Sequence, residues 1–166
     1  MKLRYKAYLI GIIFAAALVY GFPRIMRTLM YYETIKEFSD KYDVDAGLVI
    51  AIIWAESGFV THAKSHKGAV GLMQIMPATF EYLKQDLKFE GETVSLKDPR
   101  VNIEAGVYYL HKLRKEKYIN NDIELLVAYN SGRGTLLEWK KAKGGMPLEH
   151  DDVQFNETKT YVKRVM

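Results

Sequence analysis

The sequence predicts a mainly helical domain that follows one apolar N-terminal helix. Most of the chain repeats apolar residues at steps of three or four, the spacing that places side chains on one face of an α-helix. The alternation typical of a β-strand occurs only at residues 93–96, which is too short to predict a strand. With 166 residues, 49% of them hydrophobic and 27% charged, the chain is long enough to bury the core of one ordinary domain.

The N-terminal segment, residues 7–23, is apolar on all sides and contains no charged residue. As a helix it reaches about 25 Å, which is near the lower limit for crossing a hydrocarbon core about 30 Å thick. Lys2, Arg4 and Lys6 precede it without an acidic residue, and such a basic flank favours an N-terminus in the cytoplasm. The pattern predicts a transmembrane helix or signal anchor.

Two alternatives for this segment remain open. We expect residues 1–27 to stay attached as an anchor, because the apolar run continues beyond the small residues 15–17. Those three alanines also fit the A-x-A site of a signal peptide, and cleavage there would release a secreted protein. Both alternatives export residues 28–166, which we predict to form a single domain because no repeat, low-complexity tract or proline-rich linker divides them.

Helices are predicted for most of this domain. Their ranges are 28–42, 45–57, 77–87, 101–117, 123–130, 135–143 and 156–165. The first shows a one-sided pattern, with apolar residues at Leu29, Tyr32, Ile35, Phe38 and Tyr42. Pro77 suits a first helical turn, and Asp98-Pro99 combines a capping residue with such a proline. Asp122 and Asn156 are the predicted caps of the helices that follow them.

Composition and charge exclude several functions. The chain has no cysteine, which excludes a disulfide framework, a thiol nucleophile and a cysteine-based zinc site. The net charge is +4, and three of these charges precede the apolar segment, so the domain lacks the basic excess of a nucleic-acid-binding protein. His62 and His66 stand four apart but lack the intervening glutamate of a zinc protease. We therefore expect no metal, no cofactor and no nucleic-acid partner, and a monomer.

The second predicted helix ends on a carboxyl group. Leu48, Ile52 and Glu56 are four residues apart and therefore lie on one helix face. A carboxyl group at the buried end of an apolar stripe loses hydration, which raises its pKa toward the range useful for donating a proton. Gly68 and Gly71 follow in a loop that allows left-handed backbone or the close approach of a sugar chain. The alternative is an ordinary glutamate that is solvated or salt-bridged.

Four sequence blocks begin at this glutamate and keep a fixed order. They are Glu56-Ser57 with Gly-Leu-Met-Gln-Ile-Met-Pro at 71–77, Asp98-Pro99 with Asn102, Ala-Tyr-Asn at 128–130, and Glu-Thr-x-x-Tyr-Val at 157–162. Together they resemble the soluble lytic transglycosylase family from about residue 31 to the C-terminus. A Gly-Leu-Met-Gln run after Glu-Ser is far more specific than a single short motif.

The resemblance implies a lysozyme-like helical fold in the bacterial cell envelope, on the extracytoplasmic side of the membrane. Its cleft would hold a peptidoglycan glycan strand and cut it between N-acetylmuramic acid and N-acetylglucosamine. The family does this without water and leaves a 1,6-anhydromuramic acid end, using one glutamate first as acid and then as base. Matched residue by residue, Glu56 takes this role. The implied substrate-binding residues are Ser57, Met73, Gln74, Tyr129, Asn130 and Tyr161, and the motif assigns Tyr161 and Glu157 less firmly than the others.

The distribution of acidic residues also favours one catalytic carboxyl group. Ordinary glycoside hydrolysis uses two, about 5 to 9.5 Å apart, yet residues 57–80 contain no Asp or Glu. The spacing does not exclude Glu157 as a partner brought in by folding. Two alternatives therefore stay open: a lysozyme-like muramidase that uses Glu56 and a water molecule, and a non-catalytic glycan-binding protein of envelope assembly.

Overall fold

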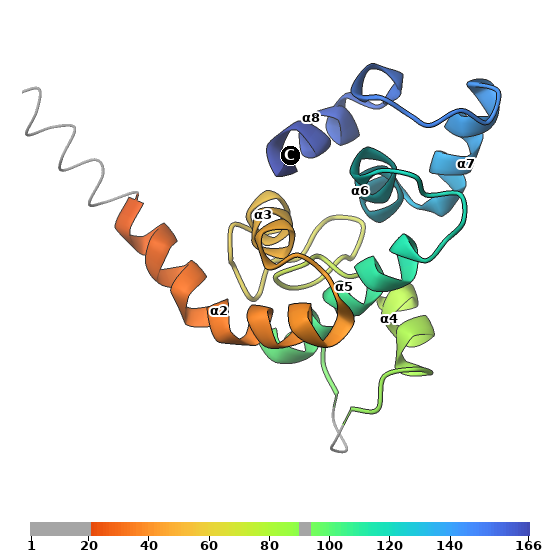
Figure 1. The fold of residues 1–166 in the computed structure, drawn as a ribbon. Helices are drawn as coiled ribbons and strands as arrows, with labels where there is room; N and C mark the ends of the chain where they lie inside the picture. The colour runs from red at the N-terminus through yellow and green to blue at the C-terminus, as the bar shows by residue number, and fades with distance from the viewer. Residues whose placement is uncertain (1–20, 90–93) are drawn as a thin grey trace, which may run out of the picture. The chain divides into compact units, whose positions relative to one another are not determined.

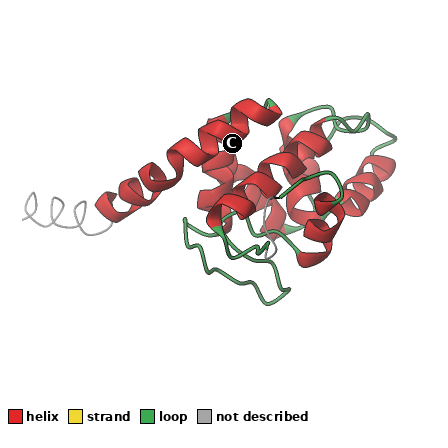
Figure 2. Cartoon of the chain, turned by 90° about the horizontal axis from the view of Figure 1, so that it is seen from below, coloured by secondary structure: helices red, strands yellow, loops and turns green. Residues whose placement is uncertain are grey.

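The structure, a computed structural model, describes residues 21–89 and 94–166, and in this part of the chain it contains helices and loops but no strand (Figures 1 and 2). The helices are α2 (Phe22–Tyr42), α3 (Ala46–Glu56), α4 (Pro77–Lys84), α5 (Pro99–Arg114), α6 (Asp122–Ser131), α7 (Arg133–Ala142), the 3₁₀ helix η2 (His150–Asp152) and α8 (Asn156–Val165). The predicted mainly helical fold class is confirmed.

The chain divides into two compact units, residues 1–33 and 34–166. In the described part of the first unit, residues 21–33, the large apolar side chains are exposed: Phe22, Ile25, Met26, Leu29, Met30 and Tyr32. Across residues 21–89 and 94–166, no helix is both long enough and apolar enough to cross a membrane. Residues 7–20 of the predicted anchor lie outside the described residues.

An aspartate caps the start of two helices, and the cap at Asp98 is the predicted one. The Asp45 carboxylate accepts a hydrogen bond from the backbone N–H of Leu48 at 2.7 Å and caps α3. The Asp98 carboxylate does the same for α5, accepting from the backbone of Arg100 at 2.8 Å. Such caps satisfy backbone donors that have no partner within the helix.

Two other predicted caps are wrong by one residue. Asn121, not Asp122, caps α6 by accepting a 2.9 Å hydrogen bond from the backbone N–H of Glu124. The Asp122 carboxylate instead pairs with Arg114 at 2.8 Å. Asn156 is the first helical residue of α8, and the cap before it has no side-chain hydrogen bond.

In the second unit, α5 supplies much of the buried core. Its fully buried apolar side chains include Ile103, Val107 and Leu110. Helix α6 packs against α5, α7 and α8, and α8 also packs against α3. Helices α3, α6 and α8, which are distant in sequence, are thereby brought together.

Helix α5 also fixes the loop between α3 and α4, residues 57–76, through Asn102. This side chain is fully buried, and its Oδ1 accepts a hydrogen bond from the backbone N–H of Met73 at 2.8 Å. Its Nδ2 donates to the carbonyl oxygens of Val70 at 2.9 Å and Leu96 at 3.0 Å. The contact is so close that a Cβ at Gly71, where φ is +83°, would lie 2.2 Å from Asn102 Nδ2. The position therefore requires glycine.

A buried ion pair fixes α6 against α7. Glu124 is fully buried and lies 2.8 Å from the ammonium group of Lys140. Burial alone raises the pKa of Glu124, but hydrogen bonds from Lys140 and from the backbone N–H groups of Asn120 and Leu148 outweigh this effect and lower it. The pair joins α6, α7 and the following loop.

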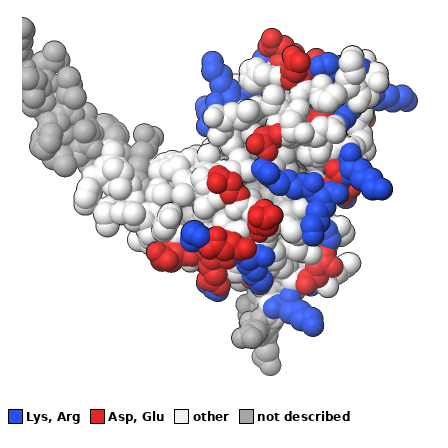
Figure 3. All heavy atoms as spheres, viewed as in Figure 1, with Lys and Arg blue, Asp and Glu red and all other residues white. Residues whose placement is uncertain are grey.

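Charges of both signs are interspersed on the face of residues 34–166 seen in Figure 3. Several exposed cations pair with carboxylates, for example Lys41 with Glu104 and Arg133 with Glu116. This face does not present the single-sign patch that a nucleic-acid-binding surface needs.

Candidate active site

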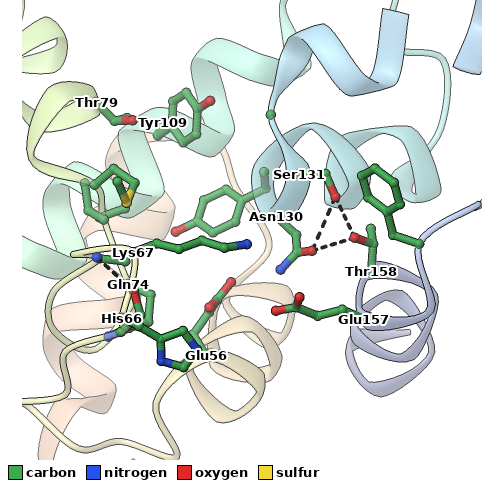
Figure 4. Close-up of a pocket in the computed structure, with 17 residues that line it drawn as sticks. Glu56, His66, Lys67, Gln74, Thr79, Tyr109, Asn130, Ser131, Glu157 and Thr158 are labelled. Atoms are coloured by element: carbon green, nitrogen blue, oxygen red, sulfur yellow. Dashed lines mark hydrogen bonds between the residues drawn. The ribbon is translucent and has the colours of Figure 1, made fainter. Parts of the chain in front are cut away.

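A cleft of about 540 Å³ opens where the end of α3, the 57–76 loop, α6 and the start of α8 meet (Figure 4). Its lining includes Glu56, Ser65, His66, Lys67, Gln74, Met76, Thr79, Tyr109, Tyr129, Asn130, Ser131, Phe155, Glu157 and Thr158. The cleft is therefore walled by aromatic rings, amides and hydroxyls around two carboxyl groups, a composition that suits a sugar chain better than an apolar ligand.

Glu56 is the last residue of α3 and follows the fully buried Ile52 and Ile53. Its carboxyl group is mostly removed from water, and this burial is the largest cause that raises its pKa to about 7. The nearby Tyr161 hydroxyl lowers the pKa, while the charge of Glu157 raises it further. Near neutral pH the group is therefore present in both the protonated and the ionised form, as a residue that acts as acid and then as base requires.

Tyr161 on α8 lies near this carboxyl group, does not line the cleft, and is 6% exposed. Its hydroxyl is buried, and no described residue lies within hydrogen-bond geometry of it. The hydroxyl is nevertheless near enough to the Glu56 carboxyl group to change the pKa of Glu56. Burial, and then the charge of Glu56, raise the pKa of Tyr161 well above its usual value. The phenol therefore keeps its proton and can donate a hydrogen bond to an ionised Glu56.

Glu157, also on α8, is exposed at the cleft. Figure 4 shows its carboxyl group pointing toward that of Glu56 from the opposite wall. The fold therefore brings Glu157 close to Glu56, which the sequence spacing alone did not exclude.

We predict that Tyr161→Phe and Glu157→Gln shift the pKa of Glu56 in opposite directions. The first change removes the group that lowers the pKa, so the pKa should rise; the second removes a negative charge that raises it, so the pKa should fall. Titration of a ¹³C-labelled Glu56 carboxyl by NMR measures both shifts. Lys163→Gln, at an exposed position on the same helix, should leave the titration unchanged. Shifts of equal sign in the first two variants would refute this assignment.

The wall opposite Glu56 comes from the end of α6. The Tyr129 hydroxyl donates a 2.9 Å hydrogen bond to the carbonyl oxygen of Met73, and its ring lies 5.6 Å from that of Tyr109. Asn130 Oδ1 accepts a 2.9 Å hydrogen bond from Thr158 Oγ1. This bond orients the amide, and Figure 4 shows the Asn130 nitrogen pointing toward the two carboxyl groups. Asn130 therefore offers a donor to a ligand in the cleft.

Gln74 contributes from the loop in a strained conformation. Its φ is +47°, a left-handed value that side-chain-bearing residues rarely adopt. Its Nε2 donates to the carbonyl oxygens of Gly71 at 2.8 Å and Ala63 at 3.2 Å. Such strain costs of order 1–3 kcal/mol and is typical of functional sites.

Besides Glu157, four of the predicted site residues line the cleft, namely Glu56, Gln74, Tyr129 and Asn130, and three do not. Tyr161 is buried next to Glu56. The Ser57 hydroxyl donates to the carbonyl oxygen of Leu72 at 2.7 Å and thus joins α3 to the loop.

The third residue, Met73, has no exposed surface. Its side chain packs so tightly on α5 that a Cβ at Gly106 would lie 2.3 Å from its sulfur atom. Met73 and Ser57 are not part of the cleft lining, and in this conformation Met73 has no surface with which to contact a sugar.

Lining residues that the sequence did not single out include Lys67, Tyr109 and Phe155. Their positions depend on how distant segments pack, so helical spacing gives no signal for them. Among the described residues, no group of His, Asp and Glu side chains has the arrangement of a metal site.

Comparison with known proteins identifies the family. The model of the transglycosylase SLT domain matches residues 33–150. The chain belongs to this family. Helix α8, which brings Glu157 and Tyr161 to Glu56, lies beyond the matched residues.

Curated relatives of this SLT domain are lytic murein transglycosylases. Membrane-bound lytic murein transglycosylase E of Buchnera aphidicola subsp. Baizongia pistaciae is 37% identical over 120 residues, which are 66% of this chain and 56% of the relative. The soluble lytic murein transglycosylase of Escherichia coli K12 is 32% identical over 143 residues, which are 83% of this chain and 22% of the relative. The chain thus spans between about a fifth and about half of the length of these relatives.

Solved structures show the same fold. The 70-kDa soluble lytic transglycosylase of Escherichia coli matches with a TM-score of 0.71 and 31% identity, over 81% of this chain and 22% of that one. An inactive glutamate-to-glutamine variant of the lytic transglycosylase Slt from Pseudomonas aeruginosa matches with a TM-score of 0.69 and 27% identity, over 80% of this chain and 22% of that one. The second unit therefore has the mainly helical, lysozyme-like SLT fold.

Proposed function

We propose that this SLT domain is a lytic transglycosylase that cleaves the β-1,4 bond between N-acetylmuramic acid and N-acetylglucosamine in peptidoglycan. The observation that carries the proposal is the Glu56 carboxyl group, whose pKa is raised to about 7 in a cleft walled by aromatic and amide side chains. The names of the relatives support the same reaction, and one solved relative is inactive as a glutamate-to-glutamine variant.

In the proposed mechanism, protonated Glu56 donates its proton to the glycosidic oxygen as the bond from that oxygen to the muramic C1 breaks. The 6-hydroxyl oxygen of the same sugar then bonds to C1, and ionised Glu56 accepts the hydroxyl proton. One C–O bond replaces another, the proton returns to Glu56, and no water is consumed. A pKa near 7 suits both steps, because a group must lose and regain a proton within one cycle at neutral pH.

The surrounding residues have distinct roles in this proposal. The Tyr161 hydroxyl keeps its proton and donates a hydrogen bond to Glu56, which stabilises the Glu56 carboxylate after Glu56 has protonated the glycosidic oxygen. The carboxylate of Glu157 faces the positive charge that develops at C1, and it also favours the protonated form of Glu56. Asn130 and Gln74 orient the sugar from opposite sides of the cleft.

A second candidate function, hydrolysis by a lysozyme-like muramidase, is supported by one observation. Glu157 places a second carboxyl group opposite Glu56, and hydrolytic glycosidases use such a pair to activate water or to form a covalent intermediate. We favour transglycosylation because the residues matching the family motifs surround Glu56.

The two reactions differ in their products. We predict that sacculi digested in H₂¹⁸O release fragments that end in anhydromuramic acid and contain no ¹⁸O. Hydrolysis would instead give a reducing end, and such a fragment is heavier than the corresponding anhydro fragment by the mass of one H₂¹⁸O. Mass spectrometry of the released fragments distinguishes these results, and a digest without protein is the control. A labelled reducing end as the main product would reject the transglycosylase mechanism, while glycan binding without cleavage would indicate a binding module.

We also propose that the apolar segment at residues 7–23 attaches the domain to the outer face of the cytoplasmic membrane. Support comes from the basic flank before this segment and from relatives that are named membrane-bound. Protease added to intact spheroplasts should then degrade the domain, and full protection would contradict this location.

A further inference from the structure

Lys67 is a cation on the wall of the cleft. It belongs to the 57–76 loop, is exposed, and lines the cleft. Figure 4 shows its side chain extending along the cleft, with the ammonium group directed toward Asn130 on the opposite wall. A long side chain that crosses a binding cleft in this way can reach a ligand without moving the backbone.

No carboxylate in the described part of the chain pairs with Lys67. Many other described cations do have such a partner; Lys41 pairs with Glu104, for example. Lys67 is also not among the groups that shift the pKa of Glu56. Among the described residues, the ammonium group therefore forms no ion pair with Glu56 or with another carboxylate.

The charges across the cleft are arranged asymmetrically. Lys67 belongs to the loop wall, whereas Glu157 lies at the start of α8 on the other side. A negatively charged substituent is repelled by Glu157 and attracted by Lys67, so a strand that carries such substituents on one side has a preferred orientation.

From this arrangement we propose that Lys67 binds a carboxylate on the glycan strand and makes the cleft selective for acidic over neutral β-1,4 glycans. The inference rests on the proposed function, because it assumes that a glycan occupies the cleft. Muramic acid carries a lactyl group whose carboxylate is free in peptide-free strands and is joined through an amide in peptide-bearing strands. In peptide-bearing strands the carboxylates belong to the stem peptide. N-acetylglucosamine carries neither a lactyl carboxylate nor a stem peptide.

The test compares three ligands on protein that cannot cleave them. Calorimetry on the Glu56→Gln background would measure binding of a peptide-free oligosaccharide of alternating N-acetylglucosamine and N-acetylmuramic acid, of the same oligosaccharide with stem peptides, and of a neutral N-acetylglucosamine oligomer of equal length. Adding Lys67→Met should weaken binding of at least one acidic ligand about fivefold at about 0.01 M salt, and this difference should disappear at about 1 M salt. Binding of the neutral oligomer should not change.

Two further variants serve as controls. Lys67→Arg keeps the charge and should keep the preference for acidic glycan. Lys64→Gln removes the same charge from an exposed residue of the same loop that does not line the cleft, and it should have no effect on the preference. If only the peptide-free ligand responds to Lys67→Met, the lactyl group supplies the carboxylate; if only the peptide-bearing ligand responds, the stem supplies it.

Other results overturn the inference. Equal weakening of the acidic and neutral ligands would show that Lys67 acts by packing, and no weakening of any ligand would show that it does not contact them. If the Glu56→Gln protein binds none of the three ligands, the proposed function fails together with this inference. Retained binding of all three with no effect of Lys67→Met rejects the inference alone.

Discussion

Replacing Glu56 with glutamine is expected to lower the rate of glycan cleavage by about 10²- to 10⁴-fold, the usual contribution of a positioned acid–base group. Glutamine has nearly the same shape as glutamic acid but cannot donate or accept the proton. The rate at which the purified domain releases soluble fragments from sacculi measures the effect. Glu138→Gln, at an exposed residue of α7 outside the cleft, should cleave at the parent rate.

The same substitution should not impair folding. Because the pKa of Glu56 is higher in the folded protein than its ordinary value of 4.5, the folded state binds more protons than the unfolded state between pH 4.5 and about 7. The free energy of unfolding therefore decreases across this range as Glu56 ionises, and the neutral glutamine avoids this loss. At pH 8 the melting temperature of Glu56→Gln should equal or exceed that of the parent. Retained cleavage by a folded variant would show that Glu56 is not the acid.

Asn102→Ala is expected to give the largest loss of stability among the substitutions considered, about 3–5 kcal/mol of the free energy of unfolding. The change leaves the backbone N–H of Met73 and the carbonyl oxygens of Val70 and Leu96 without their partner in a fully buried position. Each unsatisfied buried group costs about 1–3 kcal/mol, and partial relaxation lowers the sum.

Urea unfolding monitored by circular dichroism measures this loss. Asn156→Ala, at an exposed residue of α8, is the matched control and should change stability by no more than about 0.5 kcal/mol. A loss below about 1 kcal/mol in Asn102→Ala would mean that the loop does not depend on this side chain. Because the same loop places Gln74 in the cleft, the variant should also cleave glycan more slowly at temperatures where it remains folded.

Features that depend on local geometry could be predicted from the sequence. The helical spacing of Leu48, Ile52 and Glu56 already indicated a carboxyl group at the buried end of an apolar stripe, because an α-helix fixes which residues share a face. Helix caps were predictable to within one residue. Adjacent Asn121 and Asp122 are both good capping residues, and the ion pair of Asp122 with Arg114, which joins separate helices, leaves Asn121 as the cap.

Features that depend on contacts between distant segments could not be predicted. The family motif implied that Met73 contacts sugar, but the close approach of Gly106 on α5 directs its side chain into the core. Glu157 is about 100 residues from Glu56 in sequence, and only the packing of α8 against α3 and α6 brings the two together. Lys67 resembles many solvated lysines until the cleft beside it is known.

The titration of Glu56 in the unmodified protein tests the central claim most directly, because the whole mechanism depends on a proton donor that is poised near neutral pH. NMR of the ¹³C-labelled carboxyl group should give a pKa of about 7, with burial as the main cause. A pKa near the ordinary value of 4.5 would mean that Glu56 is ionised and solvated at neutral pH, which contradicts its role as the acid of the cleft.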